Sequence, residues 1–119
     1  MAAHNELGQW GEEVATDYLR RKGYTIVERD WKSGHRDLDI IAMDGQTLVV
    51  VEVKTRRNRL FSNPEEAIDY HKLQSLRLSA NHYVKTHRWA TEVRLDVVCV
   101  VGTPGTAEPE IEHIEDFQW

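Results

Sequence analysis

The sequence predicts an α/β domain in which a mixed β-sheet is flanked by helices, with elements in the order α-β-β-β-α-β. Two helical patterns frame three strand-like segments, and a fourth strand-like segment follows the second helix. A helix between two consecutive strands is typical of a crossover that makes those strands parallel. The 119 residues, 40% of them hydrophobic, fit one domain over residues 1–119.

The first helix is expected over about residues 5 to 22. Its apolar and small residues recur at helical spacing and form one face: Leu7, Gly11, Val14, Ala15 and Tyr18. Arg20 and Arg21 suit the negative end of the helix dipole, and Gly23 is a natural stop.

Three strands are expected next, over residues 24–31, 37–43 and 46–55. "KSGHR" reads as a turn or loop between the first two. Asp44-Gly45 is a strong two-residue turn signal, which would pair Met43 with Gln46.

The second helix is predicted to begin at Asn63, because a capping residue is followed there by Pro64 and then by a glutamate three residues after the cap. It should run to about residue 86. The segment "TEVRLDVVCVV" reads as the fourth strand, and residues 110–117 as one more short strand at an edge.

Besides Asp44 in its turn, four charged residues interrupt the apolar hairpin "DLDIIAMDGQTLVVVEVKT". With Met43 opposite Gln46, Asp37 would face Glu52 and Asp39 would face Val50. Side chains alternate along a strand, so the charged residues share one face, namely Asp37, Asp39, Glu52 and Lys54. The other face would be buried and apolar, with Leu38, Ile40, Val51 and Val53.

Carboxylates this close together repel one another, and a divalent cation such as Mg²⁺ removes the repulsion because it prefers oxygen ligands. Lys54 beside them could position or activate a water near a phosphate. This set of groups is suited to metal-assisted hydrolysis of a phosphodiester. The alternative is a solvent-facing strand whose charges pair across it, Asp37 or Glu52 with Lys54.

Charge is unevenly distributed along the chain, whose formal net charge is −5. Residues 108–119 hold five acids and no lysine or arginine, so the rest of the chain is formally neutral. "KTRRNR" carries four cations and leaves the hairpin directly. It could hold a nucleic-acid backbone, and the candidate phosphate-binding residues are Arg56, Arg57, Arg59 and Lys72.

A cytoplasmic location without a membrane span is expected. The apolar runs are far shorter than the ~20 residues that a span needs, and the N-terminal segment has no secretory pattern. Cys99 is the only cysteine and reads as a small buried thiol.

The hairpin and its surroundings resemble a known family. An Asp on one strand, Glu-x-Lys on the next and a helix on either side resemble the PD-(D/E)XK nuclease superfamily. More closely, "GQWGEEVATDYLRRKGYTIVERDW", "DLDIIA", "VVVEVKTRR" and "RLDVV" resemble the YraN family of small bacterial proteins, which is similar to archaeal Holliday-junction resolvases.

The resemblance implies a restriction-endonuclease-like fold and a Mg²⁺ site, with Mn²⁺ as a substitute. It implies that Asp39 and Glu52 hold the metal with the backbone carbonyl of Val53, that Glu12 completes the site directly or through water, and that Lys54 orients the attacking water. Glu13 competes with Glu12 for the role on the helix. Where the family reads Gly-Glu-Ile-Asp, this chain has "RDLD", so Arg36 and Asp37 replace the glycine and the glutamate.

Three functions remain open from the sequence. The first is a metal-dependent endonuclease acting on DNA rather than RNA, on branched or structured DNA in particular, and compatible with a homodimer. The second is a nucleic-acid-binding module without catalysis. The third is a protein-interaction domain on a nuclease scaffold, with the acidic tail as its contact.

Overall fold

The computed structural model describes residues 2–58 and 68–117, with side chains from residue 6 onward. The α/β prediction and the order of its elements are confirmed, and a fifth strand follows at the tail. The elements are α1 (Ala2–Arg21), β1 (Thr25–Ser33), β2 (Arg36–Asp44), β3 (Thr47–Arg56), α2 (Tyr70–Thr86), β4 (Val93–Val101) and β5 (Glu110–Ile114).

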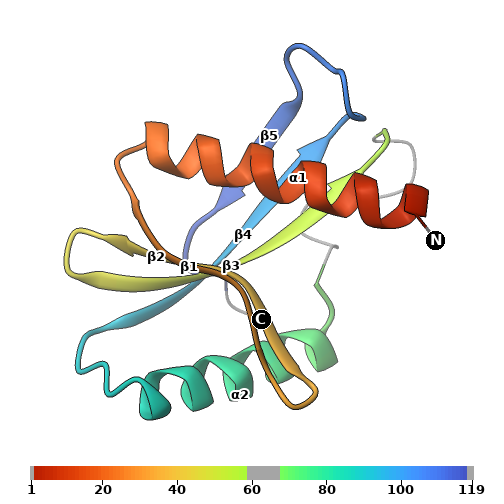
Figure 1. Ribbon diagram of the computed structural model, residues 1–119. Coiled ribbons are helices and arrows are strands. Elements are labelled where there is room, and N and C mark those ends of the chain that lie inside the picture. Colours follow the sequence, from red (N-terminus) through yellow and green to blue (C-terminus); the bar gives the residue numbers. More distant parts are fainter. Residues whose placement is uncertain (1, 59–67, 118–119) are drawn as a thin grey trace.

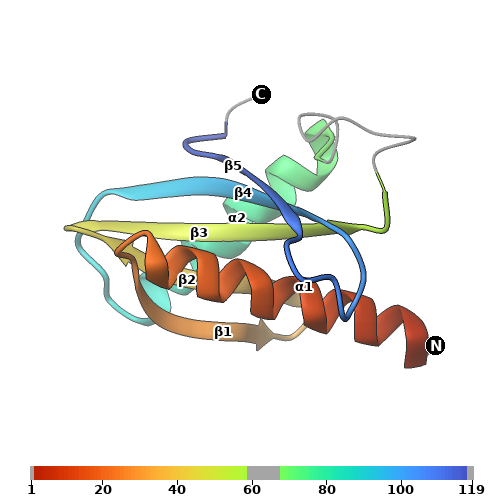
Figure 2. The same ribbon diagram turned by 90° about the horizontal axis from the view of Figure 1, so that it is seen from above.

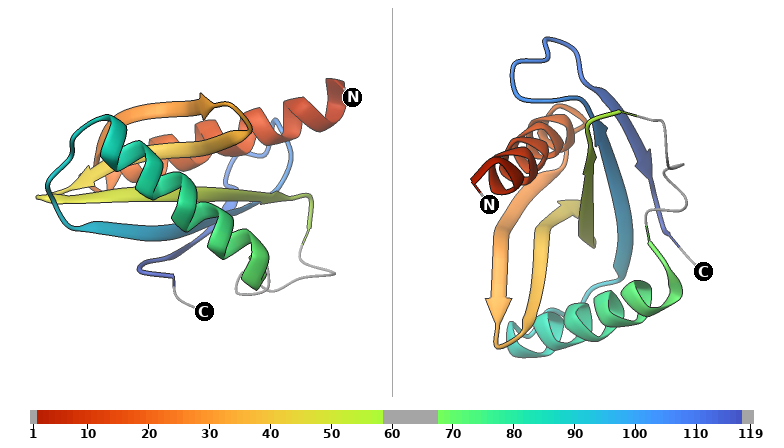
Figure 3. Two further views of the ribbon diagram at one scale, coloured as in Figure 1. Left: turned by 90° about the horizontal axis from the view of Figure 1, so that it is seen from below. Right: turned by 90° about the vertical axis from the view of Figure 1, so that its right-hand side faces the viewer.

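The sheet has the order β1-β2-β3-β4-β5. β3 and β4 are parallel, as the crossover predicted, and the other neighbours are antiparallel. α1 covers one face of the sheet and α2 the other (Figures 1 and 3). Because both faces are covered, the central strands read as nearly continuous apolar runs.

Each helix has its own core. Ala15 and Leu19 of α1 pack against alternate residues of the sheet such as Val49 and Val98. On the other face the residues from α2 are Leu73, Leu76, Ala80 and Tyr83, and they pack against residues such as Val50 and Val97. Figure 2 shows α1 lying along the sheet beside β1, β2 and β3.

Gly11 lets α1 approach the sheet closely. A Cβ at this position would collide with the Thr55 side chain of β3, whereas a Cβ at Gly8, one turn earlier, would meet nothing within 4 Å. The N-terminal half of α1 is therefore held directly against the C-terminal end of β3.

A buried polar network attaches β5 to the rest of the sheet. Asp96 of β4 is 1% exposed. Its carboxylate accepts hydrogen bonds from His113 Nε2 at 2.7 Å, from Arg94 Nε at 2.8 Å and from the Asp116 backbone N–H at 3.0 Å. Burial alone would raise the pKa of Asp96, but these hydrogen bonds outweigh it and lower the pKa below its usual value.

The predicted turn at "KSGHR" is confirmed and is short, because β1 continues to Ser33 and β2 begins at Arg36, which leaves a two-residue turn between them. One predicted helix boundary was wrong. α2 is not continuous from Asn63. Ile68 and Asp69 are not helical, and Asp69 caps the helix with its side chain. Asn63 itself lies outside the described residues.

The hairpin register was also wrong, by two residues. Met43 pairs with Leu48, and the turn is made by Gly45 and Gln46. The predicted pairs Asp37–Glu52 and Asp39–Val50 therefore do not form. An even shift keeps each side chain on its own face, so the predicted grouping of Asp39 with Glu52 survives.

The predicted common face of Leu38 and Ile40 was wrong. Ile40 packs on the α1 side, but Leu38 packs with Trp31 in the core beneath α2. The alternation of side chains along β2 is therefore interrupted at Asp39. Asp37 is exposed.

Candidate functional site

β2 and β3 separate at Asp39. The ladder between the two strands ends at the pair Ile40–Val51, and the next step brings Asp39 level with Glu52. Here the Asp39 side chain takes the place of a backbone hydrogen-bond partner for β3, since its Oδ2 accepts a hydrogen bond from the Val53 backbone N–H at 2.9 Å. The N–H and C=O of one strand residue point to the same edge, so the Val53 carbonyl faces the same opening.

Asp39 and Glu52 form a buried pair of carboxyl groups. Glu52 is 7% exposed. Burial, together with the neighbouring charge of Asp39, raises the pKa of Glu52 to about 7. Burial also raises the pKa of Asp39, although the hydrogen bonds that Asp39 accepts from Val53 and Glu52 lower the pKa in part. Both carboxyl groups therefore hold a proton more strongly than an exposed carboxyl group does.

Two lysines approach Glu52 from different elements. Lys54 Nζ of β3 lies 3.6 Å from Glu52 Oε2, and Lys72 Nζ of α2 lies 3.5 Å from the same oxygen. The sequence placed Lys54 at this site, but it grouped Lys72 with the nucleic-acid-binding residues.

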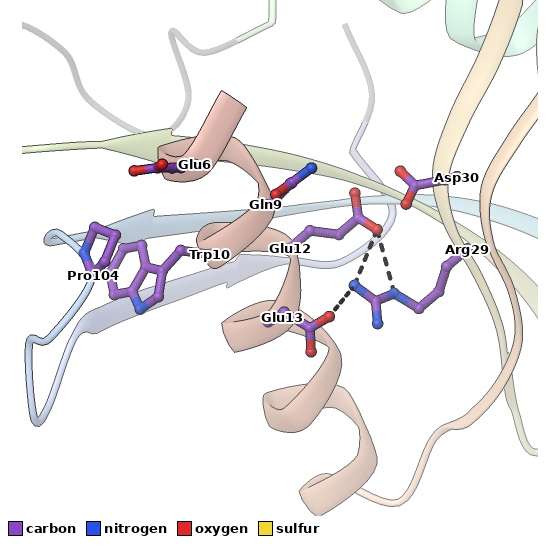
Figure 4. Close-up of a pocket in the computed structure, with 8 residues that line it drawn as sticks. All are labelled: Glu6, Gln9, Trp10, Glu12, Glu13, Arg29, Asp30 and Pro104. Atoms are coloured by element: carbon purple, nitrogen blue, oxygen red, sulfur yellow. Dashed lines mark hydrogen bonds and ion pairs between the residues drawn. The ribbon is translucent and has the colours of Figure 1, made fainter. Parts of the chain in front are cut away.

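Glu12 reaches the site from α1. Its side chain is 12% exposed, whereas that of Glu13 is 62% exposed, so of the two it is Glu12 that faces the sheet. Arg29 of β1 contacts both glutamates, at 3.2 Å from Glu12 Oε1 and 3.0 Å from Glu13 Oε1 (Figure 4).

Asp30 lies beside Glu12, and Figure 4 shows the two carboxyl groups facing one another. Burial, followed by a hydrogen bond and charge repulsion from Asp30, raises the pKa of Glu12 to about 7, although Arg29 opposes the shift. Asp30 has a φ of 51°, a left-handed conformation that is uncommon for residues other than glycine.

A groove of about 450 Å³ runs past these groups. We call it the site groove. It is lined by Leu7, Gly8, Gln9, Glu12, Asp30, Lys32, Asp39, Val53, Lys54, Thr55 and Arg56. A second groove, of about 690 Å³, shares Gln9, Glu12 and Asp30 with it and extends to Trp10 and Pro104 (Figure 4).

The site groove thus brings together Glu12, Asp39, Val53 and Lys54, with Glu52 behind Asp39. Among the residues that the structure describes, no three acidic, histidine or cysteine side chains lie close enough to hold a metal ion as they stand. Glu12 is instead engaged by Arg29. Its direct or water-mediated part in a metal site stays a prediction.

The candidate phosphate-binding residues are only partly placed. Arg56 lines the site groove, and Arg57 is exposed beyond the end of β3. Arg59 lies outside the described residues.

Sequence reasoning missed Arg29 and Asp30. "ERD" carries no signal of its own, because charged residues are ordinary near the end of an edge strand. Their proximity to Glu12 depends on how α1 crosses β1. The left-handed backbone at Asp30 could not be predicted either, because the residue there is not a glycine.

Taken together, the fold and the groove define an α/β protein that carries a carboxylate pair and two lysines at the point where two central strands separate. The chain belongs to the UPF0102 family, described as an uncharacterised protein family, whose model matches residues 11–100.

Its relatives span nearly the whole chain. It is 45% identical over 116 residues to a UPF0102 protein of Bacteroides thetaiotaomicron, covering 98% of this chain and 94% of that protein. It is 42% identical over 116 residues to one of Christiangramia forsetii, covering 98% and 96%. In the part of the chain that is described, no helix is long and apolar enough to cross a membrane.

Proposed function

We propose that this protein is a metal-dependent endonuclease that hydrolyses phosphodiester bonds in DNA, with branched or structured DNA as the favoured substrate. The observation that carries the proposal is the Asp39–Glu52 carboxyl pair, of which Asp39 lines the site groove together with Lys54.

The donor set suits a hard divalent cation. Asp39 and Glu52 offer carboxylate oxygens, and the Val53 carbonyl faces the same opening. Such oxygens are the ligands of Mg²⁺ and Mn²⁺. A bound Mg²⁺ would supply Lewis acidity and neutralise charge that develops on a phosphate.

The chain's own residues would perform the remaining tasks. Lys54 would orient the attacking water, held near the carboxylates by its ion pair with Glu52. Glu12 would bind at the edge of the metal site directly or through water. Arg56 and Arg57 would hold the sugar-phosphate backbone on the side where β3 ends. A homodimer would allow two strands to be cut symmetrically.

The test is cleavage of linear, flapped and four-way-branched DNA in Mg²⁺, Mn²⁺ or EDTA. We expect metal-dependent cutting that falls at least about 100-fold in Lys54→Ala and Glu52→Gln, since each removes a group acting on the reacting phosphate. Lys85→Ala, in the last turn of α2, is the control and should cut normally. DNA that stays intact under every metal condition would contradict the proposal.

The alternative is a nucleic-acid-binding module without catalysis. The ion pair between Glu12 and Arg29 favours it, because it occupies a carboxylate that a complete metal site would use. Binding that survives Asp39→Ala and Glu52→Ala, with no cleavage by the parent, would support this alternative.

A further inference from the structure

Lys72 has a position that helix electrostatics does not favour. It is the third residue of α2, and its backbone N–H donates to the capping carboxylate of Asp69 at 2.8 Å. The positive end of the helix dipole lies here, where a cation is unfavourable. Besides the Asp69 carboxylate, which caps the backbone, one further anion lies close to the Lys72 ammonium.

That anion is Glu52. The Lys72 ammonium lies 3.5 Å from Glu52 Oε2, the oxygen that Lys54 also approaches. Lys54 belongs to β3, the strand that also carries Glu52, whereas Lys72 belongs to α2, which covers one face of the sheet. Because the Lys72 side chain is 39% exposed, its ammonium can also move from Glu52 into solvent.

We propose that Lys72 is a tethered counter-cation that competes with the divalent metal for Glu52 and so sets the metal affinity of the site. It is a positioning residue that acts through Glu52. This inference rests on the metal site of the proposed function but not on cleavage. The mechanism is electrostatic: an ammonium near the carboxylate pair neutralises part of its charge and repels an arriving cation.

The consequence is that removing Lys72 should tighten metal binding, which is not the effect of damaging a structural contact. For Lys72→Met we expect the Mn²⁺ dissociation constant to fall about three- to tenfold, because partial exposure screens the interaction. Lys72→Arg keeps the charge and should match the parent within about twofold.

The test is Mn²⁺ titration of the full chain without DNA, followed by electron paramagnetic resonance of the free ion. Lys85→Met is the matched control. It removes the same charge from the same helix about 20 Å away, and should leave the affinity unchanged. In a Glu52→Gln background Lys72→Met should have no further effect, since the competition passes through that carboxylate.

The outcomes separate the two proposals. Equal or weaker Mn²⁺ binding by Lys72→Met overturns the role of Lys72, whether or not the protein cuts DNA. So does a parent that binds no Mn²⁺ at millimolar concentration. Tighter binding in Lys72→Met with no cleavage by any variant supports the role of Lys72 and contradicts the nuclease. Thermal unfolding in EDTA checks that each variant is folded, and Lys72→Gln serves as a second neutral variant.

Discussion

At the scale of single residues, the main feature is that Asp39 and Glu52 are buried next to each other. The positive charge around them offsets only part of the cost of burying two carboxylates. Burial raises the pKa of Asp39, and burial together with the neighbouring charge of Asp39 raises the pKa of Glu52. The two lysines on Glu52 Oε2 relieve the repulsion only in part. The protein therefore carries a local destabilisation that a bound cation would remove.

Glu52→Gln should make the metal-free protein more stable at pH 8. A carboxyl group whose pKa is raised by folding contributes full stability below its unfolded value of 4.5. It loses that contribution as the pH rises towards about 7. We expect a gain of about 1–2 kcal/mol at pH 8 and almost none at pH 4, measured by urea unfolding in EDTA.

The same substitution should abolish stabilisation by Mg²⁺ or Mn²⁺. Glu92→Gln, an exposed glutamate before β4, is the control and should change neither quantity. A Glu52→Gln variant that is less stable than the parent at pH 8 would show that the carboxylate is fully compensated by its lysines.

At the scale of elements, the contact between α1 and β3 places Glu12 over the groove. Gly11 is the residue that makes this approach close, since a side chain there would strike Thr55. The contact ties the helix that carries one candidate ligand to the strand that carries two others.

Gly11→Ala should destabilise the protein by about 1–3 kcal/mol through overpacking, in spite of the better helix propensity of alanine. Gly8→Ala, in the same helix with open space around it, should instead stabilise by about 0.5–1 kcal/mol. Thermal or urea unfolding measures both effects. Adding Thr55→Ala to Gly11→Ala should restore most of the loss, and purely additive effects would contradict the contact.

The β5 network makes a prediction for acid stability. Because the pKa of Asp96 is lowered, its contribution to stability is present above the unfolded value of 3.8. It is lost as the pH falls through the lower folded value. Asp96→Asn should cost about 3 kcal/mol at pH 7, since it leaves Arg94 and His113 without their buried partner.

The measurement for Asp96→Asn is the urea midpoint between pH 2.5 and pH 7. The parent should lose stability on acidification below about pH 4, and the variant should lose less. Equal slopes for the two proteins would show that the network does not depend on the carboxylate charge.

The elements themselves were largely predictable from the sequence, because apolar periodicity and glycine stops are local signals. The hairpin register was not. Asp44 looked like a turn residue, but it remains in β2, where its carboxylate pairs with Arg94 Nη1 at 3.0 Å. Gly45, with a φ of 61°, takes the first turn position instead. That contact joins residues 50 positions apart, and no local pattern contains it.

The candidate site was predictable in part for the same reason. Alternation along two strands was enough to group Asp39, Glu52 and Lys54. The Val53 contact with Asp39, the Arg29 contact with Glu12 and the approach of Lys72 depend on how neighbouring elements pack. The role of Arg36 and Asp37 in place of a glycine and a glutamate has no explanation in the structure.

At the scale of the whole molecule, charge decides how a polyanion could approach. The net charge is −5, so the long-range interaction with a polyanion is repulsive and binding would depend on the cations near the end of β3. Arg56 and Arg57 lie there, both exposed. Each phosphate contact should contribute to the salt dependence of binding.

Arg56→Ala combined with Arg57→Ala should weaken DNA binding at low salt and reduce the slope of log affinity against log salt by about 1–2. Fluorescence anisotropy in EDTA at several salt concentrations measures this. Arg20→Ala combined with Arg21→Ala, at the end of α1, is a charge-matched control that should leave the slope unchanged. If the two double variants gave equal slopes, DNA would not bind at Arg56 and Arg57.

The two-residue turn at Gly45 and Gln46 also constrains how the family can vary. Adding one residue to the β2 arm of this hairpin would turn Asp39 to the opposite face of the sheet, and adding one to the β3 arm would do the same to Glu52, because side-chain direction alternates. Adding two residues would shift the pairing register of the strands but would keep each side chain on its own face. Relatives that keep the carboxyl pair should therefore differ in arm length by even numbers, or carry a bulge that absorbs the odd residue.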